Sequence, residues 1–235
     1  MSIIRLVYLC FLLFISWLVI HEINSNLYNG KPISNGCDYR NDKMDLQEDL
    51  IKKYYLQCHL LGQLDYNVFK KAIKGIDIFN APKNLIAICD FTKPSNQERF
   101  FMIDLHSMKL IAKSLVAHGR NSGDVMATSF SNKMNSYQSS LGFYNIGQKI
   151  KSPKHGDALL LEGLEKGIND MARNREIIIH SADYVSYDFI NKNGRLGRSH
   201  GCPVLPSSVL KNIIPLLQNG ALLYIHGQNR LKSNS

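Results

Sequence analysis

Short apolar runs separated by turn residues dominate the chain beyond Pro82, and this pattern constrains the fold more than any other feature. Glycine, proline, asparagine, aspartate and serine bound the runs, which favours strands joined by turns over long helices. The runs cover residues 85–90, 100–105, 109–117, 141–146, 158–161, 176–180 and 221–226. The sequence therefore predicts a mainly β fold, a sandwich or barrel in a single domain.

Helical patterns flank this β-rich region. Apolar residues at roughly helical spacing predict one helix before it, at Leu46, Leu50, Tyr54 and Cys58. Asp65 can cap a second helix that buries Val68, Phe69, Ala72 and Ile73 and closes at Gly75. A later helix is expected over residues 207–218, capped by Ser207 or Ser208 and kinked or ended early by Pro215.

The N-terminus has the pattern of an export segment. A short basic start is followed by an almost wholly apolar run over residues 6–20. No small-x-small cleavage site follows it, so both a signal peptide and an uncleaved membrane anchor stay open. We divide the chain into a signal peptide or anchor (1–25), a linker with a helical extension (26–80) and one β-rich domain (81–235).

The chain carries a formal charge of +9 and five cysteines. Its lysines are spread along the sequence, which is typical of a solvated surface attracted to acidic envelope material, and nucleic-acid binding is not expected. In an oxidising compartment a catalytic thiol must stay unpaired, and Cys37, Cys58 and Cys89 have no compelling partners. We therefore expect no required disulfide.

Two segments near the C-terminus carry the chemistry. Three isoleucines lead into His180 and Ser181, and the later segment reads Ser199-His200-Gly201-Cys202-Pro203. A thiol nucleophile needs an imidazole to take its proton and donors for the oxyanion that forms on a carbonyl. Pro203 has no N–H, so any oxyanion-binding amides must come from Gly201, Cys202 or another segment.

The amino-acid sequence of these segments resembles the L,D-transpeptidase catalytic domain (YkuD type), a family of enzymes that remodel bacterial peptidoglycan. It is closest to the branch called murein L,D-transpeptidase catalytic domain proteins, and the resemblance runs from about Leu85 to about Gly227. Besides the histidine and cysteine segments, it rests on His118-Gly119-Arg120-Asn121-Ser122-Gly123, Ser139-Ser140-Leu141-Gly142-Phe143-Tyr144, Leu161-Glu162-Gly163-Leu164, Gly167-Ile168-Asn169-Asp170 and Gly194-Arg195-Leu196-Gly197-Arg198-Ser199.

The resemblance implies roles for individual residues. Cys202 would be the nucleophile and His180 its proton acceptor and donor, while the backbone carbonyl of Ser181 would orient the imidazole. His200 and Gly201 would line the oxyanion side of the site. For substrate binding we single out four residues whose polar groups suit the carboxylates of a peptide stem: His118 and Arg120 in a glycine-rich turn, and Arg198 and Ser199 beside the cysteine.

Two departures from the family pattern stand out. The stretch between His180 and Ser199 is slightly longer than in the general motif. The general motif also has Asn or Arg two residues beyond the cysteine, where this chain has Val204. The far side of the site must therefore be held by another residue.

The sequence as a whole predicts an exported, cysteine-dependent L,D-transpeptidase of the periplasm or cell envelope that acts on peptidoglycan peptide stems. The alternatives are an L,D-carboxypeptidase on the same stem and a non-catalytic peptidoglycan-binding protein. A zinc site built from His180, His200 and Cys202, completed by His118 or His226, is a further chemical interpretation. Because no Cys-x-x-Cys or His-Glu-x-x-His motif is present, we favour thiol catalysis and expect no metal or other cofactor.

Overall fold

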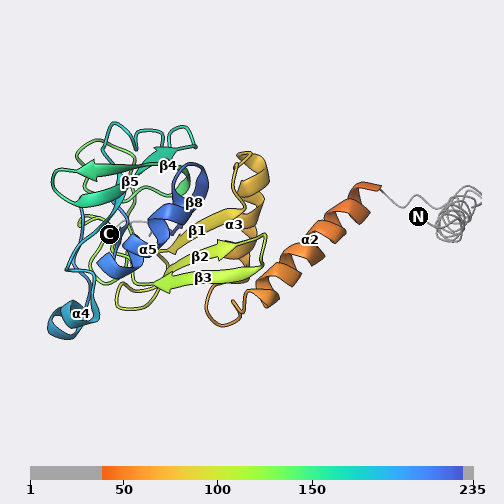
Figure 1. Ribbon diagram of the computed structural model, residues 1–235, viewed down its shortest axis with the longest axis horizontal. Coiled ribbons are helices and arrows are strands. Elements are labelled where there is room, and N and C mark those ends of the chain that lie inside the picture. Colours follow the sequence, from red (N-terminus) through yellow and green to blue (C-terminus); the bar gives the residue numbers. More distant parts are fainter. Residues whose placement is uncertain (1–38, 230–235) are drawn as a thin grey trace, which may run out of the picture. The chain divides into compact units, whose positions relative to one another are not determined.

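A computed structural model describes residues 39–229, which form a mixed sheet of eight strands (Figure 1). Their order across the sheet is β3-β2-β1-β8-β4-β5-β6-β7. The predicted signal peptide or anchor lies outside the described residues. The strands are β1 (Leu85–Asp90), β2 (Phe100–Asp104), β3 (Lys109–Ser114), β4 (Gly142–Ser152), β5 (Gly156–Gly163), β6 (Ile178–Ser181), β7 (Val204–Leu205) and β8 (Ala221–His226).

The two ends of this sheet approach each other. Neighbouring strands run antiparallel except in the β1–β8 and β6–β7 pairs. Beyond the end of β3, Ala117 forms an antiparallel bridge with Val204 of β7. The bridge nearly closes the sheet into a barrel and confirms the predicted mainly β fold.

The strands at the middle of the sheet are buried on both faces. In β1, Ala87 and Cys89 point into the core enclosed by the sheet, whereas Ile86 and Ile88 point to its outer side. Strand β2 alternates in the same way. Because side chains of a strand alternate between faces, burial of both faces requires a continuous apolar run, as the sequence shows here.

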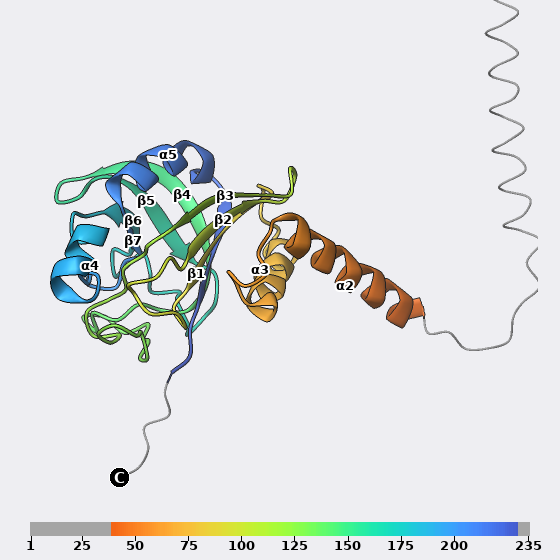
Figure 2. The ribbon, with the colours of Figure 1, turned by 90° about the horizontal axis from the view of Figure 1, so that it is seen from below.

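Helix α3 (Tyr66–Ile78) covers the outer face of β1 and β8 (Figure 2). The Asp65 side chain caps it by accepting hydrogen bonds from two backbone amides of the first turn. The four predicted apolar positions are all buried. Gly75 does not close the helix, which continues for another three residues. A Cβ at Gly75 would lie 2.2 Å from Cε1 of Phe143, so glycine allows close packing here.

Helix α2 (Tyr39–Gln57) is present where the apolar spacing predicts it. Its buried positions are Ile51 and Tyr55, followed by Cys58 just past its end, whereas Leu50 is 45% exposed. Ile51 and Tyr55 are thus buried in place of the predicted Leu50 and Tyr54, whereas Cys58 is buried as predicted. The Tyr55 hydroxyl anchors this face by donating to the carbonyl of Leu64. The side chain of Leu46 lies outside the described part. Between residues 39 and 229, no helix combines the length and apolarity needed to cross a bilayer.

Helix α5 (Ser207–Leu217) packs its apolar face on the enclosed core. The predicted serine cap is wrong, because Pro206 occupies the cap position and no side chain caps the helix. Pro215 lies inside the last turn, and the helix ends two residues later. A short helix that the sequence pattern did not predict, α4 (Tyr187–Asn193), begins after the Ser186 cap.

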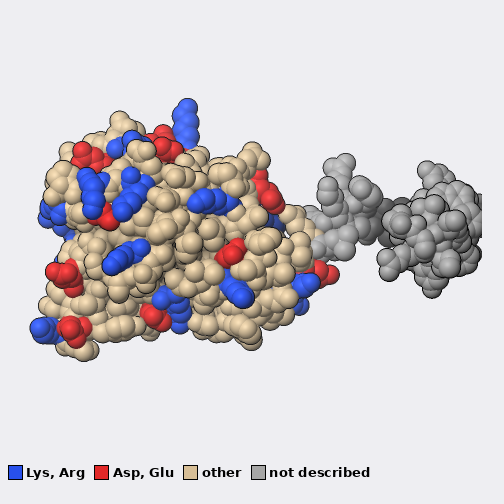
Figure 3. All heavy atoms as spheres, in the orientation of Figure 1, with Lys and Arg blue, Asp and Glu red and all other residues tan. Residues whose placement is uncertain are grey.

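The charged surface fits the even spread of lysines in the sequence. Figure 3 shows Lys and Arg side chains scattered over the visible face among Asp and Glu.

Candidate active site

The parallel pairing of β6 with β7 brings the histidine and cysteine segments together. His180 is in register with Val204, and Cys202 lies two residues before that position. Cys202 and His200 face one pocket of about 430 Å³, which also has His155 and Arg175 in its wall. The expected juxtaposition of His200 and Cys202 is therefore present, although their segment is a bend and not an extended strand.

The loop that carries Cys202 is held by its own side chains and by a neighbouring loop. The Ser199 hydroxyl donates to the carbonyl of Cys202 at 2.7 Å and accepts from the amide of Gly201 at 3.0 Å. Ser139 donates to the carbonyl of Gly201. Since Ser199 occupies the Gly201 amide, the amide of Cys202 is the stronger candidate for an oxyanion donor.

Gly201 is required by its backbone conformation and its neighbours. Its φ is +130°, a value that residues with a Cβ rarely adopt. A Cβ there would also lie 2.8 Å from the carbonyl oxygen of Gln138. Glycine thus lets the nucleophile loop pack directly against the pocket wall.

His180 has the orientation of a proton acceptor. Its Nδ1 lies 3.1 Å from the carbonyl oxygen of Ser181, the contact that the resemblance implies. Because a carbonyl only accepts, Nδ1 carries the proton and Nε2 keeps its lone pair. Burial, reinforced by the nearby His155 and Lys154, lowers the pKa of His180 to about 4. The ring is therefore neutral near neutral pH.

Cys202 is 9% exposed, and its Sγ is 3.9 Å from the carbonyl oxygen of Glu176. Burial raises the pKa of the thiol, although the Ile178 amide and the Arg175 charge act in the opposite direction. Near neutral pH the Cys202 thiol and the His180 imidazole are thus both neutral. Cys58 and Cys89 are also buried free thiols.

Arg175 was not among the residues predicted for the site. It lines the pocket and donates to the carbonyls of Ser131 and Gln138 and to the hydroxyls of Ser136 and Ser140. These bonds hold the 131–140 segment against Arg175, which lines the same pocket as Cys202. The only sequence signal for Arg175 is its place directly before the apolar strand that ends in His180. Val204, by contrast, is fully buried and cannot hold the far side.

Three side chains at the rim of the pocket contact one another in a row. The Arg120 guanidinium carbon lies 4.1 Å from the centre of the Tyr137 ring, and that ring meets His200 edge-on at 4.7 Å. Arg120 is exposed, so its charge remains available to an anionic ligand, as the sequence-based prediction of a substrate contact requires.

His118 differs from the expectation that it binds substrate, because it is fully buried. Its Nδ1 accepts from Arg99 Nη2 at 2.7 Å, and its Nε2 lies 3.3 Å from the carbonyl oxygen of Gly123. Burial, then the Arg99 charge, lowers the pKa of His118 to about 3. His118 therefore cannot reach a ligand in the pocket or complete a zinc site with His180, His200 and Cys202.

The other two proposed substrate contacts are also used within the protein. Arg198 forms an ion pair with Asp124 at 3.1 Å and donates to the carbonyl of Gly123 at 3.1 Å. The Ser199 hydroxyl is enclosed in the nucleophile loop. Both residues shape the loops around the site and do not line the pocket. No group of three or more metal-ligating side chains is gathered anywhere in residues 39–229.

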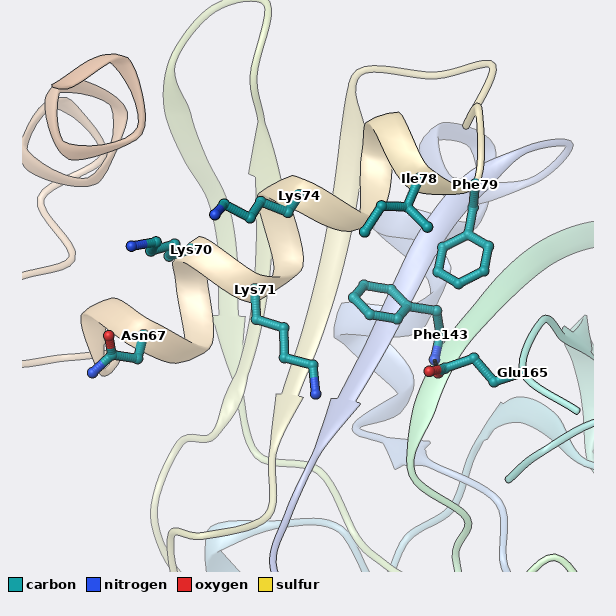
Figure 4. A pocket seen from close by; sticks show the side chains of 8 residues that line it. All are labelled: Asn67, Lys70, Lys71, Lys74, Ile78, Phe79, Phe143 and Glu165. Atoms are coloured by element: carbon teal, nitrogen blue, oxygen red, sulfur yellow. Dashed lines mark hydrogen bonds between the residues drawn. The ribbon is translucent and has the colours of Figure 1, made fainter. Parts of the chain in front are cut away.

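A second pocket of about 430 Å³ lies at α3, away from the thiol (Figure 4). Lysines of α3, including Lys71 and Lys74, border it, and Phe79 and Phe143 form its apolar part. The Glu165 carboxylate accepts from the amide of Phe143. Its lining contains no thiol or imidazole.

Solved structures with low sequence identity are similar to this one. An L,D-transpeptidase of Stackebrandtia nassauensis is 17% identical, with a TM-score of 0.40, and the match covers 76% of this chain and 77% of that one. An L,D-transpeptidase from Mycobacterium smegmatis is 12% identical (TM-score 0.38; 61% and 59% covered). The helical cell shape determining protein Pgp2 from Campylobacter jejuni is 13% identical (TM-score 0.40; 64% and 50% covered). The chain thus spans only 59% of the mycobacterial protein and 50% of Pgp2.

No curated protein matches the sequence. The family comparison is more specific, because residues 61–226 match the L,D-transpeptidase catalytic domain. The match covers more than half of the chain and includes both the histidine strand and the cysteine loop. The chain belongs to the L,D-transpeptidase catalytic domain family.

Proposed function

We propose that this protein is an exported, cysteine-dependent L,D-transpeptidase that acts on the tetrapeptide stems of peptidoglycan. One observation supports the proposal: β6, which carries His180, pairs with β7, and the loop directly before β7 carries Cys202, which lines a pocket. The Nδ1 of His180 lies against the Ser181 carbonyl, which leaves Nε2 to accept a proton. An acyl transfer through a thioester needs a nucleophile, a base and a pocket in this arrangement.

In the first half of the reaction, the Cys202 sulfur attacks the carbonyl carbon of the stem's third residue, and the thiol proton passes to His180 Nε2. The Cys202 amide stabilises the oxyanion, and the Arg175 charge favours the negative transition state. His180 then gives its proton to the departing amine of D-alanine. The carbon–nitrogen bond breaks and a thioester remains on Cys202.

In the second half, an amine of a neighbouring stem attacks the thioester, and His180 takes the proton from that amine. The sulfur leaves and recovers a proton from His180, and the new amide links the third residues of two stems. Water in place of the amine would make the protein an L,D-carboxypeptidase. Neither step needs a metal or nucleotide, because the thioester retains the acyl-transfer potential.

The charges of the pocket suit a substrate rich in carboxylates. Lys154 and Arg175 are among its lining residues, and Arg120 lies at the rim, whereas Glu176 is the one carboxylate in the described lining. A neutral resting thiol also fits this substrate, because ionisation then occurs only when a carbonyl is in place to receive the charge.

We place the protein in the cell envelope, with the apolar segment over residues 6–20 serving as its signal peptide or membrane anchor. Peptidoglycan lies outside the cytoplasmic membrane, so the substrate and the export segment agree. The basic balance of the chain would favour contact with acidic wall material.

Mass spectrometry of a disaccharide-tetrapeptide incubated with the protein tests the proposal, with Cys202→Ser as the matched control. We expect loss of D-alanine and formation of dimers with the natural protein and neither product with the variant. Loss of D-alanine without dimers would assign the carboxypeptidase. Binding without any change of the substrate would replace the proposal by a peptidoglycan-binding role.

A further inference from the structure

A second histidine lies face to face with His180. The rings of His155 and His180 stack with their centres 3.8 Å apart and their planes 25° from parallel. His155 belongs to the turn between β4 and β5, and β5 pairs with β6, which carries His180. The hairpin therefore brings His155 over the imidazole from a segment that none of the sequence motifs contains.

The stack completes the restraint on the His180 ring. The Ser181 carbonyl holds one edge of the ring through Nδ1, but a single hydrogen bond still allows the ring to tilt about it. His155 covers one face and blocks that motion. With both contacts in place, Nε2 has one direction in which to accept a proton, and proton transfer depends strongly on such alignment.

The same contact links the charges of the two rings. Two imidazolium ions 3.8 Å apart repel each other, so His180 accepts a proton readily only while His155 is neutral. His155 also lines the pocket and is partly exposed, so it can exchange protons with the solvent. We propose that His155 is a positioning residue that aligns the His180 ring for catalysis and that, when protonated, stops His180 from acting as a base.

The charged groups around the pair leave this repulsion uncompensated. Lys154 of the same turn and His200 of the nucleophile loop both disfavour a positive charge on His155. Asp157 of β5 is paired with Lys149 and Lys151 on the hairpin. From β6 the stack meets the Ser181 carbonyl, and Cys202 and Glu176 lie in the pocket wall. Neither Asp157 nor Glu176 forms an ion pair with His155 or His180.

Two substitutions separate alignment from charge. His155→Ala removes both the stacked ring and its charge, whereas His155→Phe keeps a flat ring over His180 and removes only the charge. We expect His155→Ala to lower kcat roughly tenfold to a hundredfold with a much smaller change in KM, because misalignment affects the chemical step. We expect His155→Phe to retain most of the activity at pH 7.5 and to move the acid limb of the kcat profile to lower pH. In the natural protein this limb reports protonation of His155, whereas in the variant it reports the later protonation of His180 itself.

His106→Phe is the matched control, since His106 is an exposed histidine in the turn between β2 and β3. This variant should leave both kcat and the pH profile unchanged. Equal activities of the natural protein, His155→Ala and His155→Phe at all pH values would overturn the proposal. An equal loss in His155→Ala and His155→Phe, with an unmoved acid limb, would overturn it as well.

The inference rests on the proposed function, so one readout must be independent of turnover. NMR titration of the His180 ring in the full chain, with carbon-13 in the imidazoles, provides it. In His155→Phe the midpoint for protonation of His180 should move to higher pH than in the natural protein. If D-alanine release fails but this shift occurs, the coupling stands and the proposed reaction falls. If release is observed but the midpoint does not move, the coupling is wrong.

Discussion

Two buried histidines in this protein have opposite tautomers. His118, after β3, accepts from Arg99 at Nδ1 and has Nε2 against the Gly123 carbonyl, so both of its ring nitrogens are engaged. His180, in β6, has Nδ1 against the Ser181 carbonyl, and no hydrogen bond to Nε2 is formed within residues 39–229. Burial alone therefore does not determine which ring nitrogen of a histidine carries the proton. What distinguishes His180 is a ring nitrogen without a hydrogen bond in the described residues, on a strand that pairs with β7 directly after the Cys202 loop.

The largest effect that would sharpen this comparison is on turnover. His180→Gln should lower kcat by about 10²- to 10⁴-fold, because an amide cannot take the thiol proton. The rate of D-alanine release measures the loss, and circular dichroism confirms the fold. A variant that retains more than a tenth of the activity would show that another group is the base.

Gly201→Ala should cause the next largest loss of turnover. The added Cβ meets the Gln138 carbonyl at 2.8 Å while φ is +130°, so the nucleophile loop must shift. We expect kcat to fall roughly tenfold to a hundredfold. The matched control Gly167→Ala also has a positive φ, +78°, but its Cβ would meet no atom within 4 Å, and its turnover should be near that of the natural protein. Similar losses in both variants would contradict the role assigned to the close contact.

For stability the order of the two histidines should be reversed: substitution of His118 should cost more than substitution of His180. His118→Leu leaves a buried Arg99 donor without its acceptor and should lower the free energy of unfolding by about 1–3 kcal/mol. His180→Leu replaces a buried polar ring by an apolar side chain and should cost less or even stabilise the fold. Urea denaturation at pH 7.5 measures both. The reverse order would mean that His180 is the structural residue of the two.

The smallest expected effect is on the pH dependence of stability. Both histidines have a pKa below the ordinary value, about 3 for His118 and about 4 for His180, so the unfolded chain binds protons first as the pH falls. Stability is therefore complete above about pH 6.5 and is lost as the pH falls towards 4. At pH 5.5 each ring should cost on the order of 1 kcal/mol relative to pH 7.5.

Urea midpoints of the natural protein, His118→Leu and His180→Leu at the two pH values test this. Each variant should lose part of the pH dependence. If neither substitution reduces it, other groups set the acid sensitivity of the fold.

The sequence predicted those parts of the fold that local patterns determine. The strands, the apolar face of α3 and its Asp65 cap follow from spacing and capping chemistry within a few residues. Strand β7 was not predicted, because it has only two residues and these pair with β6, a strand distant in the sequence. The cap of α5 was misassigned because Ser207 lies one residue beyond Pro206, the position that the backbone selects.

The candidate site shows the same division. Cys202, His180 and the Ser181 contact could be predicted, because a motif keeps them at fixed spacing. His155 and Arg175 come from a hairpin turn and a loop, and only the tertiary structure brings them to the pocket. His118 was misread because an apolar stretch followed by a polar segment does not reveal whether the histidine faces solvent or a buried arginine.

The central claim is that Cys202, with a neutral His180 as base, forms an acyl intermediate. Mass spectrometry of the natural protein quenched in acid during turnover of the disaccharide-tetrapeptide tests it most directly. The account predicts a covalent adduct that has lost D-alanine and maps to the peptide containing Cys202, absent from Cys202→Ser and strongly reduced in His180→Gln. Release of D-alanine by Cys202→Ser at the natural rate would contradict it.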